Sequence, residues 1–205
     1  KHGDFDWGDL DGNGLPDLVV FADSIETYMN RDGGFDREEL LQPQMYSGGS
    51  FGRNGIHVVD FDRDGRNDIV CAGTGGNDVE QTVLYRNTGT LLEPFGDPLP
   101  YGYTSMDWAD QDGNGYPDLV IAGPTAVYLN HGGVLSSSGY DVAPEDEYHH
   151  DDLVYWLDIT GDGVPDLVSS SRHQLLETRF LISSGDAMTG ADIYLTDESW
   201  HNGKD

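Results

Sequence analysis

Short runs of alternating apolar and polar residues recur along the chain, and glycine-bearing turns separate them. Four such runs lead into an aspartate: "FDWGD" from Phe5, "IHVVD" from Ile56, "SMDWAD" from Ser105 and "VYWLD" from Val154. Alternation with a period of two is typical of a β-strand with one buried face. No window of about 11 residues or more keeps an apolar stripe at helical spacing. The pattern therefore predicts an all-β protein.

Each run leads into one copy of an acidic motif, and a second apolar run follows the motif. The copies are "DLDGNGLPDLVV" from Asp9, "DFDRDGRNDIVC" from Asp60, "DQDGNGYPDLVI" from Asp110 and "DITGDGVPDLVS" from Asp158, and they begin 51, 50 and 48 residues apart. A third run ("ETYMN", "TVLYRN", "AVYLN", "TRFLIS") and a less regular fourth segment complete each unit. Four strands in a unit of about 50 residues predict a β-propeller blade.

The repeats predict a single domain over residues 1–205, made of four blades at approximately 1–50, 51–100, 101–149 and 150–198. Residues 199–205 begin a further strand or close the ring. Two arrangements fit: a small four-bladed ring, or part of a larger propeller or assembly. The tail "SWHNGKD" resembles "FGRNGIH", the run into the second copy, but no acidic motif follows it. A chain that stops inside a repeat favours the larger propeller or assembly.

The acidic motif places oxygen-bearing side chains at fixed positions. If the first aspartate is position 1, such side chains occupy positions 1, 3, 5 and 9, and glycine occupies position 6 in all four copies. A loop of this kind, with position 7 offering its carbonyl, can wrap Ca²⁺. Ligation by oxygen alone favours Ca²⁺ over zinc or copper, and a wrapped loop favours it over Mg²⁺. A metal-free turn rich in Asp and Asn would explain one copy, but it explains four copies in phase poorly.

An EF-hand is excluded because position 12 holds no glutamate; it is Val20, Cys71, Ile121 or Ser169. The fourth copy is the weakest because Thr160 offers a hydroxyl group at position 3.

The charge of the chain narrows the choice of partners. Thirty-eight acidic residues and ten Lys plus Arg give a formal net charge of −28. Such a chain repels nucleic acid and anionic membranes and attracts cations. No apolar run approaches the roughly 18 residues of a membrane helix, so no membrane insertion is expected. Cys71 is the single cysteine, so an intrachain disulfide is excluded, and we expect its side chain to be a small buried hydrophobe.

Further short motifs carry a family resemblance. Phe51-Gly52 lies ahead of the second acidic motif and Tyr101-Gly102 lies in the same phase ahead of the third. "IAGP" follows at Ile121 to Pro124, with "VYLNHGG" after it. Together with the acidic loops, these motifs resemble the FG-GAP/VCBS repeats of integrin α-chain-type propellers, propeller lectins and many secreted bacterial proteins. The resemblance covers essentially the whole chain and implies a calcium-binding β-propeller with up to four Ca²⁺ ions.

The resemblance also implies a set of metal ligands. The side-chain ligands would be Asp9, Asp11, Asn13 and Asp17; Asp60, Asp62, Asp64 and Asp68; Asp110, Asp112, Asn114 and Asp118; and Asp158, Thr160, Asp162 and Asp166. The backbone carbonyls of Leu15, Arg66, Tyr116 and Val164 would join them.

The function expected from these features is non-enzymatic. Loops of this kind in extracellular modules bind Ca²⁺ at about 10⁻⁴ to 10⁻³ M, which indicates a secreted or cell-surface protein. We expect a binding or adhesion module whose partner is a glycan or an extracellular protein. The aromatic residues available for a lectin-like site are Trp200, Tyr101, Tyr103, Tyr140 and Tyr148. Trp7, Trp108 and Trp156 each lie two residues before a loop aspartate, and we expect them to pack within the blades.

Two alternatives remain at this stage. The incomplete repeat at the tail suggests a structural subunit of a surface fibre or larger assembly, in which the terminal strand pairs with a neighbouring chain. The other alternative is the propeller domain of a polysaccharide-degrading enzyme, for which "EDEYHHDD" (Glu145 to Asp152) is the best cluster. A solvated acidic loop explains that cluster better, and no Ser/His/Asp or HExxH pattern occurs. The sequence therefore predicts no enzyme.

Overall fold

The structure is a computed structural model, and it describes residues 4–21, 24–38, 55–74, 80–100, 105–122, 125–140, 153–170, 178–184 and 188–191. These residues form four antiparallel sheets of four strands each. The first sheet contains β1 (Asp4–Gly8), β2 (Asp17–Phe21), β3 (Ile25–Arg31) and β4 (Gly34–Glu38). The second contains β5 (Ile56–Val59), β6 (Asp68–Thr74), β7 (Glu80–Asn87) and β8 (Leu92–Pro100). The third contains β9 (Met106–Ala109), β10 (Asp118–Ile121), β11 (Ala126–Asn130) and β12 (Leu135–Ser137), and the fourth β13 (Leu153–Leu157), β14 (Asp166–Ser170), β15 (Thr178–Ser183) and β16 (Met188–Ala191).

Each sheet is a meander in which consecutive strands are neighbours. The acidic loop joins the first strand to the second in every sheet, so the four loops occupy equivalent places. The register is also equivalent: Trp7 pairs with Leu18, which pairs with Tyr28, as Trp108 pairs with Leu119 and Leu119 with Tyr128. The all-β fold and its four blade-like sheets are therefore confirmed.

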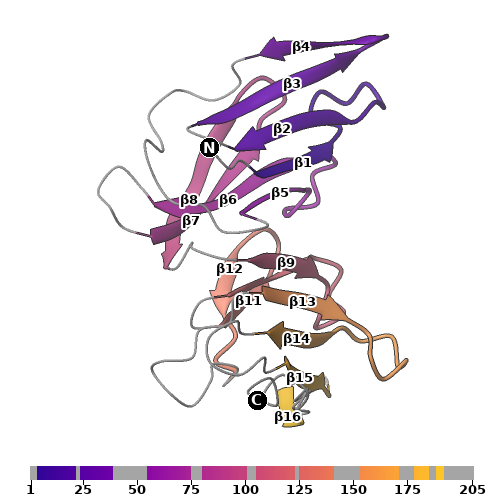
Figure 1. The fold of residues 1–205 in the computed structure, drawn as a ribbon, viewed down its shortest axis with the longest axis vertical. Coiled ribbons are helices and arrows are strands. Elements are labelled where there is room, and N and C mark those ends of the chain that lie inside the picture. Colours follow the sequence, from indigo (N-terminus) through magenta and orange to yellow (C-terminus); the bar gives the residue numbers. More distant parts are fainter. Residues whose placement is uncertain are drawn as a thin grey trace, which may run out of the picture.

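The apolar cores lie between the sheets, which follow one another in sequence order from the top to the bottom of Figure 1. In β6, Ile69 and Cys71 belong to the core shared with the first sheet, whereas Val70 and Ala72 belong to the core shared with the third. A third core joins the third and fourth sheets. Alternation along a strand thus fills two different cores, because the second and third sheets are covered on both faces.

Two packing predictions can be compared with this arrangement. Cys71 is fully buried in the first core, and burial raises the pKa of its thiol, as expected for a small buried hydrophobe. Trp156 is 9% exposed in the third core and Trp108 packs against the second. Trp7 is different: it lies on the outer face of the first sheet and is 46% exposed. There it contacts Phe5 and Phe35 of its own sheet, and its packing between sheets stays a prediction because no described sheet lies on that face.

The row of described sheets is open, with the first and fourth sheets at opposite ends (Figure 1). Each sheet lies inside one of the four predicted units, but the boundaries of those units stay a prediction. Residues 199–205, predicted to begin a further strand or to close the ring, lie outside the described residues. In the described part of the chain, no helix has the length and apolar character needed to cross a membrane.

Candidate metal centres

The acidic loops need a left-handed backbone at two positions. The glycine at position 6 has φ of +85°, +89°, +91° and +87° in Gly14, Gly65, Gly115 and Gly163. Position 4 has the same backbone in every loop, with φ between +59° and +76°; it is glycine in three loops and Arg63 in the second. Side chains other than glycine rarely adopt such angles. Position 4 is a requirement that the sequence analysis missed, although Gly12, Gly113 and Gly161 were visible there.

The aspartate at position 1 folds each loop around its carboxylate. Asp9 accepts hydrogen bonds from the backbone N–H groups of Gly12 and Gly14, both at 2.8 Å. Asp158 accepts from Gly161 at 2.7 Å and from Gly163 at 2.9 Å in the fourth loop. These bonds turn the backbone of the loop inward around the carboxylate at position 1.

The oxygen of the position 5 side chain binds the backbone N–H of position 7. The distances are 2.8, 2.9, 2.7 and 2.9 Å for Leu15, Arg66, Tyr116 and Val164. The residues expected to offer carbonyl ligands are therefore held beside position 5, and the ligation itself stays a prediction.

The aspartate at position 9 connects the loop to the sheet. Its members Asp17, Asp68, Asp118 and Asp166 are all 0% exposed. In the third loop, Asp118 accepts from Gln111 N through Oδ2 and from Asn130 N through Oδ1, both at 2.7 Å. The other three copies make the same two bonds, to position 2 of the loop and to the end of the third strand. Position 9 is therefore a structural clamp as well as a candidate ligand.

Burial raises the pKa of two of these clamps. The pKa of Asp68 rises to about 7, because burial disfavours its charged form. The backbone N–H of Asn87 opposes that rise, and the nearby negative charge of Asp62 adds to it. Burial also raises the pKa of Asp118. A carboxylate that is buried beside other carboxylates gains from a proton or a bound cation.

Three of the four loops gather enough carboxylates to hold a cation. The groups are Asp9, Asp11 and Asp17; Asp60, Asp62 and Asp64; and Asp110, Asp112 and Asp118, and within each group one oxygen per residue lies within 4.8 Å of the others. In the third loop, Asp110 Oδ1 is buried and has no hydrogen-bond partner. A hard divalent cation fits this all-oxygen donor set and would give that oxygen a partner.

The fourth loop gathers no such group among the described residues, which include the whole loop. Its position 3 is Thr160, so its three carboxylates (Asp158, Asp162 and Asp166) do not include one at that position. The loop keeps the clamp by Asp166 and the inward folding by Asp158. The same loop fold therefore forms without the complete ligand set.

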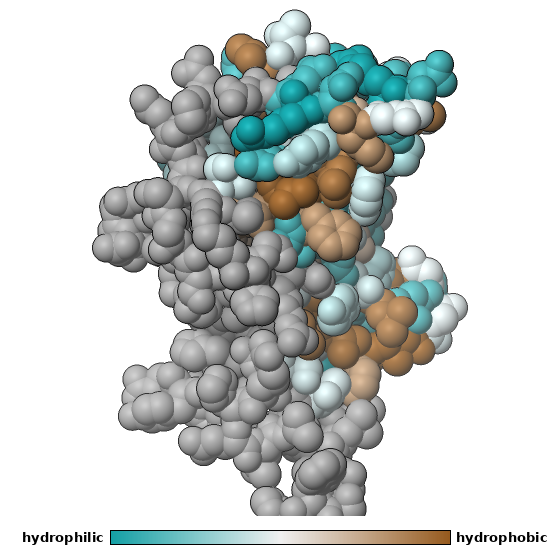
Figure 2. Space-filling view, turned by 45° about the horizontal axis from the view of Figure 1, so that its top comes forward, coloured by the Kyte–Doolittle hydropathy of each residue, from teal (hydrophilic) through white to brown (hydrophobic). Residues whose placement is uncertain are grey.

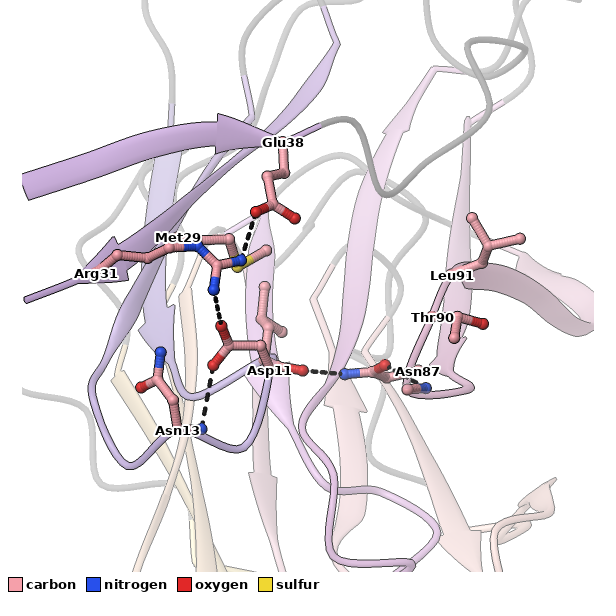
Figure 3. Close-up of a pocket in the computed structure, with 10 residues that line it drawn as sticks. Asp11, Asn13, Met29, Arg31, Glu38, Asn87, Thr90 and Leu91 are labelled. Atoms are coloured by element: carbon pink, nitrogen blue, oxygen red, sulfur yellow. Dashed lines mark hydrogen bonds and ion pairs between the residues drawn. The ribbon is translucent and has the colours of Figure 1, made fainter.

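Basic side chains from outside the loops contact the aspartates at position 3. Arg31 Nη1 lies 3.2 Å from Asp11 Oδ2, Arg86 Nε lies 2.6 Å from Asp62 Oδ2, and His131 Nε2 lies 3.8 Å from Asp112 Oδ2. Figure 3 shows Arg31 between Asp11 and Glu38, in a cleft of about 430 Å³ bordered by Asn87 and Thr90 of the second sheet. The sequence analysis did not identify these three contacts. Arg31 and Arg86 partly neutralise the first and second loops, whereas the third loop has only the exposed His131 beside it.

The aromatic residues proposed for a sugar site fall mostly outside the described residues: Tyr101, Tyr103, Tyr148 and Trp200. Tyr140 is half-buried against the third core, and its hydroxyl lies 3.4 Å from Gln111 Oε1. It therefore packs against this core, and its part in a sugar site stays a prediction. The acidic cluster from Glu145 to Asp152 also lies outside the described residues.

Comparison with known proteins identifies the repeat. A family model described as an FG-GAP-like repeat matches residues 9–71 and again residues 60–121, which together span more than half of the chain. The chain belongs to the FG-GAP-like repeat family. Each match runs from one acidic loop into the second strand of the next sheet, so it covers one period of the structural repeat and the start of the next. The resemblance inferred from the short motifs is therefore confirmed.

The curated relatives of these FG-GAP repeats include integrin α chains. Integrin alpha-PS5 of Drosophila melanogaster is 31% identical over 147 residues, covering 59% of this chain and 15% of the relative. Integrin alpha-5 of Xenopus laevis is 25% identical over 169 residues (66% and 16%), and human integrin alpha-IIb 36% identical over 104 residues (43% and 10%). The chain thus spans less than a fifth of the length of each of these three relatives.

Proposed function

We propose that this chain is a calcium-stabilised, non-enzymatic adhesion module that acts outside the cell or on its surface and binds an extracellular protein. The observation that carries the proposal is the set of three carboxylate groups, placed on FG-GAP repeats similar to those of integrin α chains. The likeness to integrins supports adhesion, and the carboxylate groups support calcium. Enzymatic activity gains no support from either.

Calcium is the cation that suits these loops best. The ligands are carboxylate, amide and carbonyl oxygens on one short turn, which suits the larger and more adaptable coordination sphere of Ca²⁺. When bound, the ion neutralises carboxylates that otherwise repel one another. The chain's own residues do the rest: position 1 folds the loop, and position 9 ties it to the third strand.

A protein partner is better supported than a glycan. The relatives compared above are named integrin α chains. Of the aromatic residues suggested for sugar binding, only Tyr140 is described, and it packs against a core. A glycan is the alternative partner that an experiment must separate, because a glycosylated protein offers both a protein surface and a glycan.

The test of this function is calcium-dependent retention on extracellular proteins. Immobilised matrix proteins and cell-surface ectodomains are probed with the chain in Ca²⁺ and, separately, in chelator. We expect saturable binding to at least one of them in Ca²⁺ only, unchanged when its glycans are removed enzymatically. Loss of binding after deglycosylation would favour a lectin, and absence of binding to a broad panel would contradict the adhesion proposal.

The ligand sets predict how many ions bind. We expect about three Ca²⁺ ions per chain, since the fourth loop lacks the carboxylate at position 3. Thr160→Asp supplies it and should raise the number measured by equilibrium dialysis toward four. Thr160→Asn is the matched control, because asparagine has nearly the shape of aspartate but an uncharged amide oxygen. Unchanged binding in Thr160→Asp would contradict the ligand role of position 3.

A further inference from the structure

The second acidic loop has the most positive charge beside its carboxylates. Arg86 Nε lies 2.6 Å from Asp62 Oδ2, and the guanidinium of Arg66 contacts Asp64. The side chain of Asp62 is only 6% exposed, and Arg86 also lies over the ring of Phe95, with 4.0 Å between its Cζ and the ring centroid. An ion pair that is shielded from water is stronger than one on the surface. Two of the three carboxylates grouped in this loop therefore already have a cation of the protein's own.

The turn between β11 and β12 of the third sheet closes over Asp62. Gly133 lies in that turn with φ of +85°, and a Cβ built on it would lie 2.6 Å from Asp62 Cβ, closer than such atoms approach. Glycine is therefore needed for this close contact. The contact explains why Asp62 is nearly buried, whereas its counterpart Asp11 in the first loop has a side chain that is 24% exposed.

The first loop has one arginine beside it, in a more exposed setting. Arg31 Nη1 lies 3.2 Å from Asp11 Oδ2, and Glu38 contacts the same guanidinium (Figure 3). Arg31 is 46% exposed, and Figure 2 shows hydrophilic residues gathered over the outer strands of the first sheet, at the top of the view. Water and salt weaken such a pair. Arg31 therefore neutralises Asp11 less than Arg86 neutralises Asp62.

The third loop has the least positive charge beside it. Among the described residues, no lysine or arginine forms an ion pair with its aspartates, and His131 Nε2 lies 3.8 Å from Asp112 Oδ2 with its side chain 63% exposed. The buried Asp110 Oδ1 has no hydrogen-bond partner, whereas both carboxylate oxygens of Asp9 and of Asp60 accept backbone N–H groups. A bound cation therefore relieves the most repulsion in this loop, and gives a partner to an oxygen that lacks one.

We infer that Arg31 and Arg86 are internal counter-cations that compete with calcium, so that the loops fill in the order third, first, second. The inference rests on the calcium binding proposed above and deepens it. Calcium either displaces Arg31 from Asp11 and Arg86 from Asp62 or binds beside their positive charge, and both routes weaken its binding. The chain therefore responds to calcium in steps over a wide range of concentrations, and the second loop fills last.

Two-dimensional NMR of the full chain during a calcium titration follows each loop separately. The backbone N–H groups of Gly14, Gly65 and Gly115 each donate to the carboxylate at position 1 of their own loop, at 2.8, 3.1 and 2.9 Å. Each amide signal should therefore shift when its own loop binds calcium. We expect the lowest midpoint for Gly115 and the highest for Gly65, about tenfold apart at low salt, where charges are least screened.

Arg86→Met removes the charge and keeps an apolar side chain against Phe95. The midpoint of Gly65 should fall about tenfold, whereas the midpoints of the other two loops should stay unchanged. In chelator the variant should melt at a lower temperature than the unaltered chain, because Asp62 loses its counter-cation. Saturating calcium should remove most of that deficit. An arginine with a purely structural role would lower the melting temperature equally in both conditions.

His131→Arg tests the inference in the opposite direction. His131 follows Asn130 as Arg31 follows Asn30, so the variant places an arginine beside the third loop where the first loop has one. The side chain of His131 is 63% exposed, so folding should persist. The midpoint of the third loop should rise about three- to tenfold, toward that of the first. His131→Gln adds no charge and should leave it unchanged.

Arg37→Met is the control for the loss of a positive charge elsewhere in the chain. Among the described residues, the ion pair of Arg37 is with Glu26, at 3.1 Å. This variant should leave all three midpoints unchanged. Equal midpoints in the three loops, or midpoints that do not move in Arg86→Met and His131→Arg, would overturn the inference and leave the calcium centres intact. Glycine signals that do not move well above about 10⁻³ M calcium would contradict both.

Discussion

Replacing Asp118 by alanine is expected to lower the free energy of unfolding by about 2–6 kcal/mol, even in chelator. The Asp118 carboxylate is 0% exposed and accepts backbone N–H groups of Gln111 and Asn130, both at 2.7 Å. Its removal leaves two buried donors without a partner, and each such donor costs about 1–3 kcal/mol. Urea unfolding in chelator and in Ca²⁺ measures the loss, which should be larger in Ca²⁺ because a ligand is lost too.

Asp112→Ala is the control within the same loop. Asp112 accepts the backbone N–H of Asn114 at 3.0 Å in an exposed setting, so its removal should cost less than about 1 kcal/mol in chelator. In Ca²⁺ it should reduce the stabilisation by the ion. Equal losses for the two variants in chelator would contradict the assignment of position 9 as a clamp.

Calcium should raise the melting temperature by roughly 15–30 °C. At about 100 times the dissociation constant, one site adds ~2.7 kcal/mol to the free energy of unfolding, and three sites add roughly 8 kcal/mol. For a chain of this size, each kcal/mol shifts the melting temperature by about 2–4 °C. Calorimetry in Ca²⁺ and in chelator measures the shift. Mg²⁺ at the same concentration is the control and should give a smaller one.

The size of the calcium effect should depend on pH. The pKa of Asp68 lies at about 7 in the folded chain without calcium, against an ordinary value of 3.8. The folded chain thus keeps a proton that the unfolded chain loses, and the stability of the calcium-free protein falls as the pH rises from about 4 to 7. Ca²⁺ requires the deprotonated carboxylate, so the difference between the two melts should widen over the same range. Identical melts with and without Ca²⁺ at pH 8 would refute the metal centres.

Much of the fold follows from local sequence because the signals repeat in phase. Alternation and the acidic spacing are enough to predict the strands, and the loops need glycine where φ is positive. Other features depend on register between segments. Arg31 and Arg86 reach equivalent aspartates from β3 and β7. In the sequence, however, Arg31 follows Asn30, whereas Arg86 precedes Asn87, the asparagine at the same place in its strand. No spacing rule predicts that convergence.

The sequence shows an asparagine at the end of the third strand in three repeats, but it does not reveal what the side chain binds. "YMN", "YRN" and "YLN" end in Asn30, Asn87 and Asn130, in phase with the acidic loops. Only the folded chain shows that Asn87 and Asn130 donate to a carbonyl of the preceding loop. The exposure of Trp7 was equally hidden, because its place in the repeat is the one that buries Trp156. The two tryptophans differ because the third sheet covers Trp156, whereas no described sheet covers Trp7.

Because the apolar cores lie between the sheets, the stability of this architecture depends on the contacts between neighbouring sheets more than on each sheet alone. In the described part of the chain, three such cores join the four sheets, and β6 contributes to two of them. Emptying one core should therefore weaken both sheets that share it, as in other arrays stabilised through adjacent units.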